Sequence, residues 1–243
     1  MQSWGLTDPG CVRKQNQDAY RIEQLDRSTL LCVVCDGMGG AKSGNIASSL
    51  AADVFTEEVR SCWKASLDSQ QTDQVLRSAV KQANFTVFDQ AAQFEEFAGM
   101  GTTLTAVLVH EGKATIINVG DSRVYGINRS GIRLLTKDHS LVQMMVDRGE
   151  ITPEQAKVNP SKNLITRAVG TEPSVICDIF PMKLEKGDYL LLCSDGLTNL
   201  LDEQEILFEV AHGLNKEQCC QRLLDIALKR GAPDNVTSIL IMI

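Results

Sequence analysis

Four aspartates in the sequence each border an apolar run that is typical of a buried β-strand. They are Asp36 after Leu30–Cys35, Asp121 shortly after Thr115–Val119, Asp195 after Tyr189–Ser194, and Asp234 shortly before Val236–Ile243. Where neighbouring strands are antiparallel, the end of one lies beside the start of the next. The carboxylates could therefore gather at one edge of a sheet core, where they repel unless a cation lies among them. Oxygen-rich sites suit Mg²⁺ or Mn²⁺, so the pattern predicts a hydrolytic centre with several metal ions.

Two further segments could complete such a centre. The polar segment 13–18 contains Arg13, whose planar fork can bind two phosphate oxygens, and Asp18, which could hold a metal-bound water. The glycine-rich stretch 37–40 follows Asp36 and lets the backbone approach a metal or a phosphate closely.

Each of these features, taken alone, also fits an ordinary structure. The segment 13–18 could be a solvated surface turn, and 37–40 could be a tight turn capped by Ser43. Gly120 and Asp121 could form a hairpin turn, and Asp234 with Asn235 could form an Asx turn. Taken together, and each bordering an apolar run, the four aspartates favour the metal interpretation.

The elements that must position these residues occur in blocks. Strand patterns are found at Leu30–Cys35, Thr102–His110, Ala114–Val119, Arg123–Ile127, Ile132–Leu135, Val175–Phe180, Asp188–Cys193 and Val236–Ile243. Helical patterns are found at about Ser43–Trp63, Thr72–Phe94, Ser140–Arg148, Asp202–Gly213 and Lys216–Arg230. Short turns between strands, such as 110–113, favour antiparallel pairing. The layout predicts an α+β sandwich with helices on its outer faces.

Composition restricts the class of protein. The net charge of −7 and the pI near 5.1 argue against a nucleic-acid or anionic-membrane partner. The first ten residues lack a signal-peptide pattern, and no apolar run is long enough to span a bilayer. The eight cysteines fit a reducing compartment, and we expect them to be small buried hydrophobes. Cys32 and Cys35 should point to opposite faces of a strand, so they should not share a metal. We expect one cytoplasmic domain, 1–243, that is monomeric, binds no nucleic acid and does not insert into membranes.

The order of the motifs resembles the metal-dependent protein phosphatase family of type 2C, in its compact bacterial branch of serine/threonine phosphatases. The resemblance covers nearly the whole chain. It rests on the segments 13–18, 35–40, 99–103, 120–123, 138–140, 163–170, 194–197 and 234–235.

The resemblance implies a four-layer α-β-β-α sandwich with two central antiparallel sheets, and hydrolysis of phosphoserine and phosphothreonine in proteins by a metal-bridging hydroxide. It implies two core Mn²⁺ or Mg²⁺ ions and a weaker third. Asp36 would bridge the core ions with help from the Gly37 carbonyl, and Asp195 and Asp234 would complete the first site. The remaining implied roles are a water-mediated contact for Asp18, the third ion for Asp121, and the substrate phosphate for Arg13.

The family pattern is not matched everywhere. Met38 stands where many relatives carry a histidine proposed as general acid, so the leaving group would take its proton from another source. Asn199 stands where some relatives carry an aspartate, which should weaken the third metal site. By resemblance, 140–164 is a flap beside the active site, His139 supports the site indirectly, and the substrates are those of a bacterial serine/threonine kinase.

Other functions stay open from the sequence. A catalytically silent phosphoprotein-binding module on this fold would not need Asp36, Asp195 and Asp234 together. A metal-dependent phosphatase of small molecules would need the same site and differ in substrate. A serine esterase is disfavoured because the sequence contains no G-x-S-x-G motif.

Overall fold

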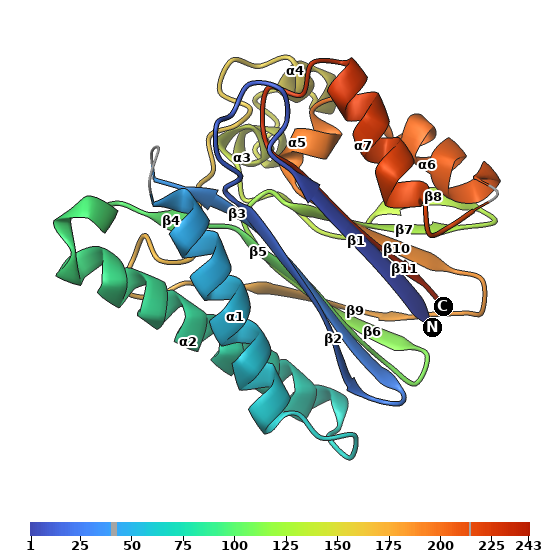
Figure 1. Cartoon of the computed structure of the whole chain (residues 1–243), viewed down its shortest axis with the longest axis horizontal. Coiled ribbons are helices and arrows are strands. Elements are labelled where there is room, and N and C mark those ends of the chain that lie inside the picture. The colour runs from blue at the N-terminus through green and yellow to red at the C-terminus, as the bar shows by residue number, and fades with distance from the viewer. Residues whose placement is uncertain (40–42, 214) are drawn as a thin grey trace.

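The computed structural model describes residues 1–39, 43–213 and 215–243, and two antiparallel sheets form its centre (Figure 1). The first sheet has the strand order β1 (Gln2–Asp8), β11 (Val236–Met242), β10 (Tyr189–Cys193), β7 (Arg123–Asn128) and β8 (Gly131–Leu134). The second has the order β2 (Asp18–Asp26), β3 (Thr29–Met38), β5 (Leu104–His110), β6 (Lys113–Val119) and β9 (Asp178–Lys183), and the short β4 (Gly101–Thr102) pairs with β3.

Helices cover the outer face of each sheet (Figure 1). The long helices α1 (Gly44–Cys62) and α2 (Ser69–Gln93) pack on the second sheet, and η1 (Glu95–Phe97) follows them. The helices α5 (Asp195–Thr198), α6 (Glu203–His212) and α7 (Cys219–Lys229) pack on the first sheet. The remaining two, α3 (Leu141–Asp147) and α4 (Pro153–Lys157), lie within 140–164. The predicted four-layer arrangement is confirmed.

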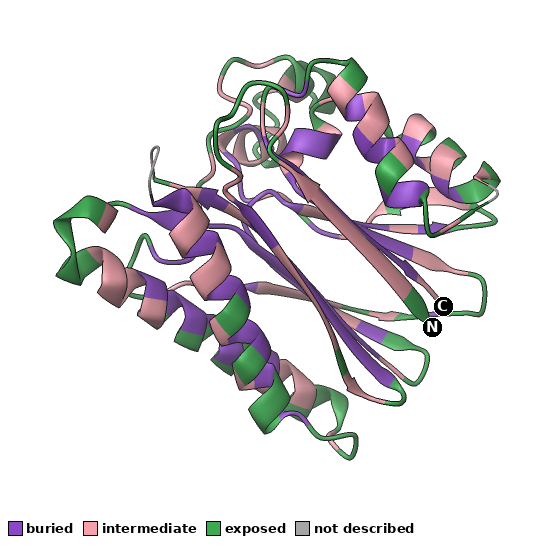
Figure 2. Cartoon of the chain, viewed as in Figure 1, coloured by how far each residue is buried: buried purple, intermediate pink, exposed green. Residues whose placement is uncertain are grey.

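The alternation of side chains along the strands builds three apolar layers. In β3, Leu31, Val33 and Cys35 face α1 and α2, whereas Leu30, Cys32 and Val34 face the other sheet. The same period of two divides β10, in which Leu191 and Cys193 face α7 and Leu190 and Leu192 face inward. Figure 2 shows buried residues along these strands and on the inner helix faces, with exposed residues outside. The opposite orientation of Cys32 and Cys35 is therefore confirmed.

The predicted elements are largely confirmed, with differences of a few residues at their ends. The helix expected from Thr72 begins at Ser69, because Asp68 and Gln71 form a reciprocal capping box. The strand expected at Val175–Phe180 is displaced to Asp178–Lys183, and the run Thr102–His110 is interrupted at Thr103. Strands β1 and β2 were not predicted.

One sequence expectation is wrong. Cys11 and Cys62 are exposed, so these two thiols are not buried hydrophobes. The alternative interpretation of Gly120 and Asp121 as a hairpin turn does not hold, because β6 before them and β7 after them belong to different sheets. Of the glycine-rich stretch 37–40, Gly40 lies outside the described residues. In the described part of the chain, no helix is long and apolar enough to cross a bilayer.

Candidate metal-dependent active site

Asp18 and Asp36 lie directly opposite each other on neighbouring strands. Asp18 begins β2, Asp36 is two residues from the end of β3, and their Cα atoms are register partners. Like charges that face each other across an antiparallel pair destabilise it. This end of the second sheet therefore carries a local electrostatic cost that a bound cation would relieve.

The backbone around Asp36 is fixed by its neighbours. Its N–H donates to Thr103 Oγ1 at 2.9 Å, and its carbonyl accepts from Thr103 N at 2.9 Å. The next residue, Gly37, donates its N–H to Gln17 O at 3.0 Å. A Cβ on Gly37 would lie 2.0 Å from the carbonyl oxygen of Gly44, so only glycine allows α1 to begin this close to β3.

The second Asp-Gly pair uses its glycine in the same way. Asp195 begins the short helix α5 directly after β10, and Gly196 follows it. A Cβ on Gly196 would lie 1.9 Å from the carbonyl oxygen of Asn235. The absence of that atom lets the start of α5 approach the turn that carries Asp234. Both aspartates are therefore followed by glycine, because a neighbouring backbone carbonyl leaves no room for a side chain at that position.

Asp18 is held by hydroxyl groups of the other sheet. It is buried, and its Oδ2 accepts from Ser194 Oγ at 2.7 Å and from Thr237 Oγ1 at 2.6 Å. Because Thr237 gives its proton to Asp18, the 2.6 Å contact between the Thr7 and Thr237 hydroxyls must be donated by Thr7. Asn16 Nδ2 donates in turn to Thr7 at 2.8 Å. Among the described side chains, no hydrogen-bond donor reaches Asp18 Oδ1, although that atom is buried.

Asn235 fixes the loop that carries Arg13. Its Oδ1 accepts from the Gln17 N–H at 2.8 Å, and its Nδ2 donates to the carbonyls of Pro9 and Gln15, both at 3.0 Å. Sequence reasoning treated Asn235 as a turn residue and missed this role, since its partners are more than 200 residues away. Arg13 itself donates from Nη2 to Asp234 Oδ2 at 2.8 Å.

Asp121 lies in the crossover between the sheets and is buried. The crossover is held by a 2.9 Å contact between the Ser122 and Thr103 hydroxyls and by the Gly120 N–H, which donates to His139 Nδ1 at 3.0 Å. His139 is thus one step removed from the carboxylates, consistent with the expected indirect role.

One cavity brings most of the predicted site residues together. It has a volume of about 770 Å³, and we call it the acidic cavity. Its lining includes Arg13, Asp36, Gly37, Asp121, Asp195 and Asp234, together with Val12, Lys14, Met38 and Ile165. Asp18 is not among the lining residues, although it lies beside Asp36 on the neighbouring strand. Met38 offers a thioether and no dissociable proton at this position.

The carboxylates raise one another's pKa. Burial, with the charges of Asp195 and Asp234, raises the pKa of Asp18 to about 7, against the hydroxyl hydrogen bonds that lower it. Burial and the charge of Asp195 raise the pKa of Asp121 to about 7. Burial, then Asp18 and Asp195, raise the pKa of Asp36 well above its usual range. Such mutual repulsion marks a place where cations would bind.

The donor set fits hard divalent ions, although it is not a preformed cage. Within the described residues, no three Asp, Glu, His or Cys side chains already converge as ligands of one ion. Mg²⁺ and similar ions keep several waters and need only one or two carboxylates each. The unpartnered, buried Oδ1 of Asp18 and the clustered carboxylates of the acidic cavity are compatible with that mode of binding.

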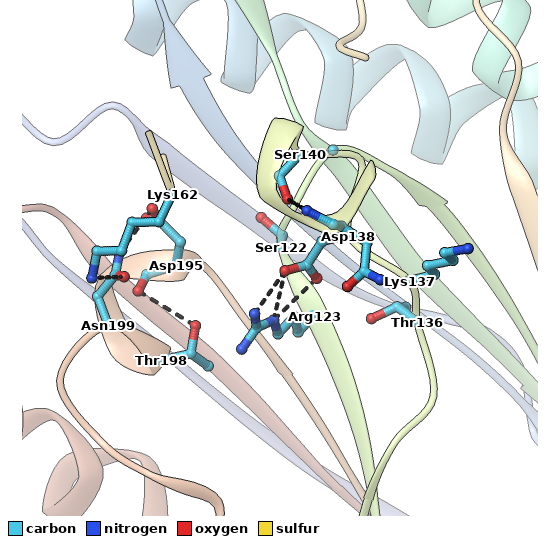
Figure 3. A network of polar contacts seen from close by, with 12 residues as sticks. Ser122, Arg123, Thr136, Lys137, Asp138, Ser140, Lys162, Asp195, Thr198 and Asn199 are labelled. Carbon is cyan, nitrogen blue, oxygen red and sulfur yellow. Dashed lines mark hydrogen bonds and ion pairs between the residues drawn. The ribbon is translucent and has the colours of Figure 1, made fainter. Parts of the chain in front are cut away.

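The segment 140–164 reaches the site through a chain of hydrogen bonds. Lys162 Nζ donates to Asn199 Oδ1 at 2.9 Å, and Asn199 Nδ2 donates to Asp195 Oδ2 at 3.0 Å (Figure 3). At the two ends of this segment, Leu141 N donates to Leu164 O at 2.8 Å, and Ser140 pairs with Ile165. Asn199 therefore links the Lys162 ammonium to Asp195.

A family model described as "Protein phosphatase 2C" matches residues 12–229, and the fold and the acidic cavity agree with it. The chain belongs to this family. A "Putative protein phosphatase 2C-type" of Streptococcus pyogenes is 36% identical over 97% of this chain and 94% of its own length. "Serine/threonine phosphatase stp" of Listeria monocytogenes is 34% identical over 97% of this chain and 93% of its own length.

A solved structure leads to the same family. The crystal structure of serine/threonine phosphatase Stp1 from Staphylococcus aureus matches with a TM-score of 0.93 and 38% identity, covering 100% of this chain and 94% of that one. The predicted family, fold class and enzyme class are thereby confirmed. This protein phosphatase 2C chain is a serine/threonine protein phosphatase of bacterial type.

Proposed function

We propose that this phosphatase hydrolyses phosphoserine and phosphothreonine in proteins at the acidic cavity, with Mn²⁺ or Mg²⁺ as cofactor. One observation carries the proposal. Aspartates from four separated segments line one cavity in a chain of the protein phosphatase 2C family. Their mutual repulsion would be relieved by divalent ions.

Each carboxylate has a proposed role. Asp36 and the Gly37 carbonyl would hold the two core ions, and Asp195 and Asp234 would complete one of the two sites. Asp18 would hold a core ion through water, which suits its unpartnered Oδ1. Asp121 would hold a weaker third ion. When bound, these ions would lower the pKa of the attacking water and offset the charge of the phosphoryl group.

The chain itself supplies binding and orientation. The Arg13 guanidinium lines the acidic cavity and is available for a substrate phosphate once ions compete for Asp234, its partner in the structure. The hydroxyls of Ser194 and Thr237 orient Asp18. Met38 cannot donate a proton, so the leaving alkoxide takes its proton from solvent within the cavity.

The cellular setting is part of the same proposal. The chain acts as a single catalytic domain, 1–243, with 140–164 as its flap. It works as a cytoplasmic monomer on proteins phosphorylated by a bacterial serine/threonine kinase, and it does not act on nucleic acid. The bacterial relatives and the net charge of −7 support this setting.

Metal removal and replacement test the function directly. The purified protein should lose phosphopeptide hydrolysis in EDTA and regain it with Mn²⁺. Asp36→Asn should abolish turnover and weaken Mn²⁺ binding measured by calorimetry. Asp53→Asn, an exposed change on α1 with a single ion pair to Arg21, is the matched control and should leave both unchanged.

Three outcomes would contradict the proposal. Full turnover in a metal-stripped sample would refute the metal mechanism. Mn²⁺ binding without any hydrolysis would favour a silent phosphoprotein-binding module. Faster hydrolysis of free phosphometabolites than of phosphopeptides would favour a small-molecule phosphatase.

A further inference from the structure

Three apolar side chains line part of the acidic cavity. They are Val12, which is 67% exposed, and the partly buried Met38 and Ile165. Leu164, which is 55% exposed, precedes Ile165 but does not line the cavity. Single exposed aliphatic residues are common on protein surfaces, but the three lining residues come from separate segments and border one cavity. We call Val12, Met38 and Ile165 the apolar wall.

The backbone beneath the apolar wall is fixed. The loop with Val12 is held by Asn235, and the Cys11 N–H donates to Ala232 O at 2.9 Å. Ile165 pairs with Ser140 at the base of the flap, and Met38 belongs to β3. A surface that is ordered before it binds loses little conformational entropy on binding. The apolar wall is therefore suited to recognition.

The chemistry of the apolar wall restricts what can lie against it. Its side chains offer no N–H or O–H group, so a charged or amide side chain placed there would lose hydration without gaining a hydrogen bond. An aliphatic side chain would bury apolar surface, and the flexible Met38 thioether can adapt to its shape. Arg13 and Lys14 follow Val12 along the same loop and line the same cavity. The position for a phosphate and the apolar wall are thus contiguous.

We propose that the apolar wall receives an aliphatic side chain immediately next to the phosphorylated residue of the substrate. The phosphatase would then prefer phosphoproteins in which leucine, isoleucine, valine or methionine precedes or follows the phosphoserine or phosphothreonine. This inference rests on the proposed function and narrows its substrate class. Val12 and Ile165 act as specificity-determining residues.

The test compares three phosphothreonine peptides of identical length and charge. One has asparagine on both sides of the phosphothreonine, one has leucine before it, and one has leucine after it. Release of phosphate in Mn²⁺ gives kcat/KM for each. At least one leucine peptide should exceed the asparagine peptide by about tenfold, which is the usual contribution of a hydrophobic contact to specificity.

Variants connect the preference to the apolar wall. Val12→Thr keeps the branched shape of the side chain and replaces one methyl group by a hydroxyl, and Ile165→Thr replaces the ethyl group by a hydroxyl and shortens the side chain. Each should reduce the ratio between leucine and asparagine peptides about threefold or more. Val158→Thr is the matched control. Val158 is also an exposed aliphatic residue of the flap, 83% exposed, but it does not line the acidic cavity. Its substitution should leave the ratio unchanged.

The outcomes separate this inference from the proposed function. Equal hydrolysis of the three peptides, or an equal change of the ratio in Val158→Thr, would overturn the inference alone. Failure to hydrolyse any phosphopeptide in Mn²⁺ would overturn the proposed function and the inference with it.

Discussion

Replacing Asn235 by alanine should detach the loop that carries Arg13. Asn235 is 4% exposed, and its side chain makes three hydrogen bonds, to Pro9, Gln15 and Gln17. A hydrogen bond contributes about 0.5–1.5 kcal/mol net, so three correspond to roughly 3 kcal/mol of unfolding free energy. For a chain of this size that loss corresponds to a fall in Tm of about 6–12 °C.

The loosened loop should also affect the reaction. Arg13 lines the acidic cavity only if the loop stays in place, so KM for a phosphopeptide should rise, by about tenfold for each 1.4 kcal/mol of binding free energy lost. Asn84→Ala is the matched control, since Asn84 is a buried asparagine whose side chain binds Glu172 O at 3.0 Å and Gly170 N at 2.8 Å.

Thermal unfolding and steady-state kinetics on both variants decide the matter. Both should lower Tm, but only Asn235→Ala should raise KM. The reasoning would be refuted by an unchanged KM in Asn235→Ala, because the loop would then not depend on its three hydrogen bonds. It would equally be refuted by a matching rise of KM in Asn84→Ala, because general destabilisation would then explain the effect.

The remaining predictions concern the metal site. In EDTA, the unfolding free energy measured by thermal unfolding should fall as pH rises from about 4 toward about 7, because the native state holds protons on Asp18 and Asp36 more strongly than the unfolded chain does. Saturating Mn²⁺ should abolish this dependence on pH. Asp121→Ala should leave two Mn²⁺ ions bound in calorimetry but reduce phosphopeptide turnover strongly, and unchanged turnover would remove the third ion from the scheme. Lys162→Met should tighten the weakest Mn²⁺ site about twofold to fivefold, because an ammonium linked through Asn199 to Asp195 repels a cation; weaker binding would contradict this.

The clustering of the aspartates was predictable because it depends on local patterns. An apolar run that ends in aspartate and glycine identifies both the strand and its end, and antiparallel pairing brings such ends together. Asp195 and Asp234 lie where this reasoning placed them, at the end of β10 and shortly before β11. Asp36 departs slightly, since β3 continues to Met38 and pairs there with β4.

The strand β2 was not predictable from its own sequence, because charged residues interrupt its apolar pattern. Those charges have partners on α1. Arg21 Nε donates to Asp53 at 2.6 Å, and Glu23 accepts from Arg60 at 2.9 Å. Partners in another element leave no local signal, so the segment resembles a solvated loop. The position of Asp18 opposite Asp36 could not be predicted for the same reason.

The acidic cavity lies where the two sheets are joined by polar contacts, and this explains how the fold tolerates its carboxylates. Asp18 belongs to the second sheet, but its partners Ser194 and Thr237 belong to segments of the first. The hydroxyls lower the pKa of Asp18, while burial and the other aspartates raise it to about 7. The contacts that join the sheets therefore also offset part of the repulsion between the carboxylates. A cation bound at this edge would reduce the repulsion between the carboxylates and would lie where the two sheets contact each other. Metal binding and the packing of the two sheets should therefore stabilise each other.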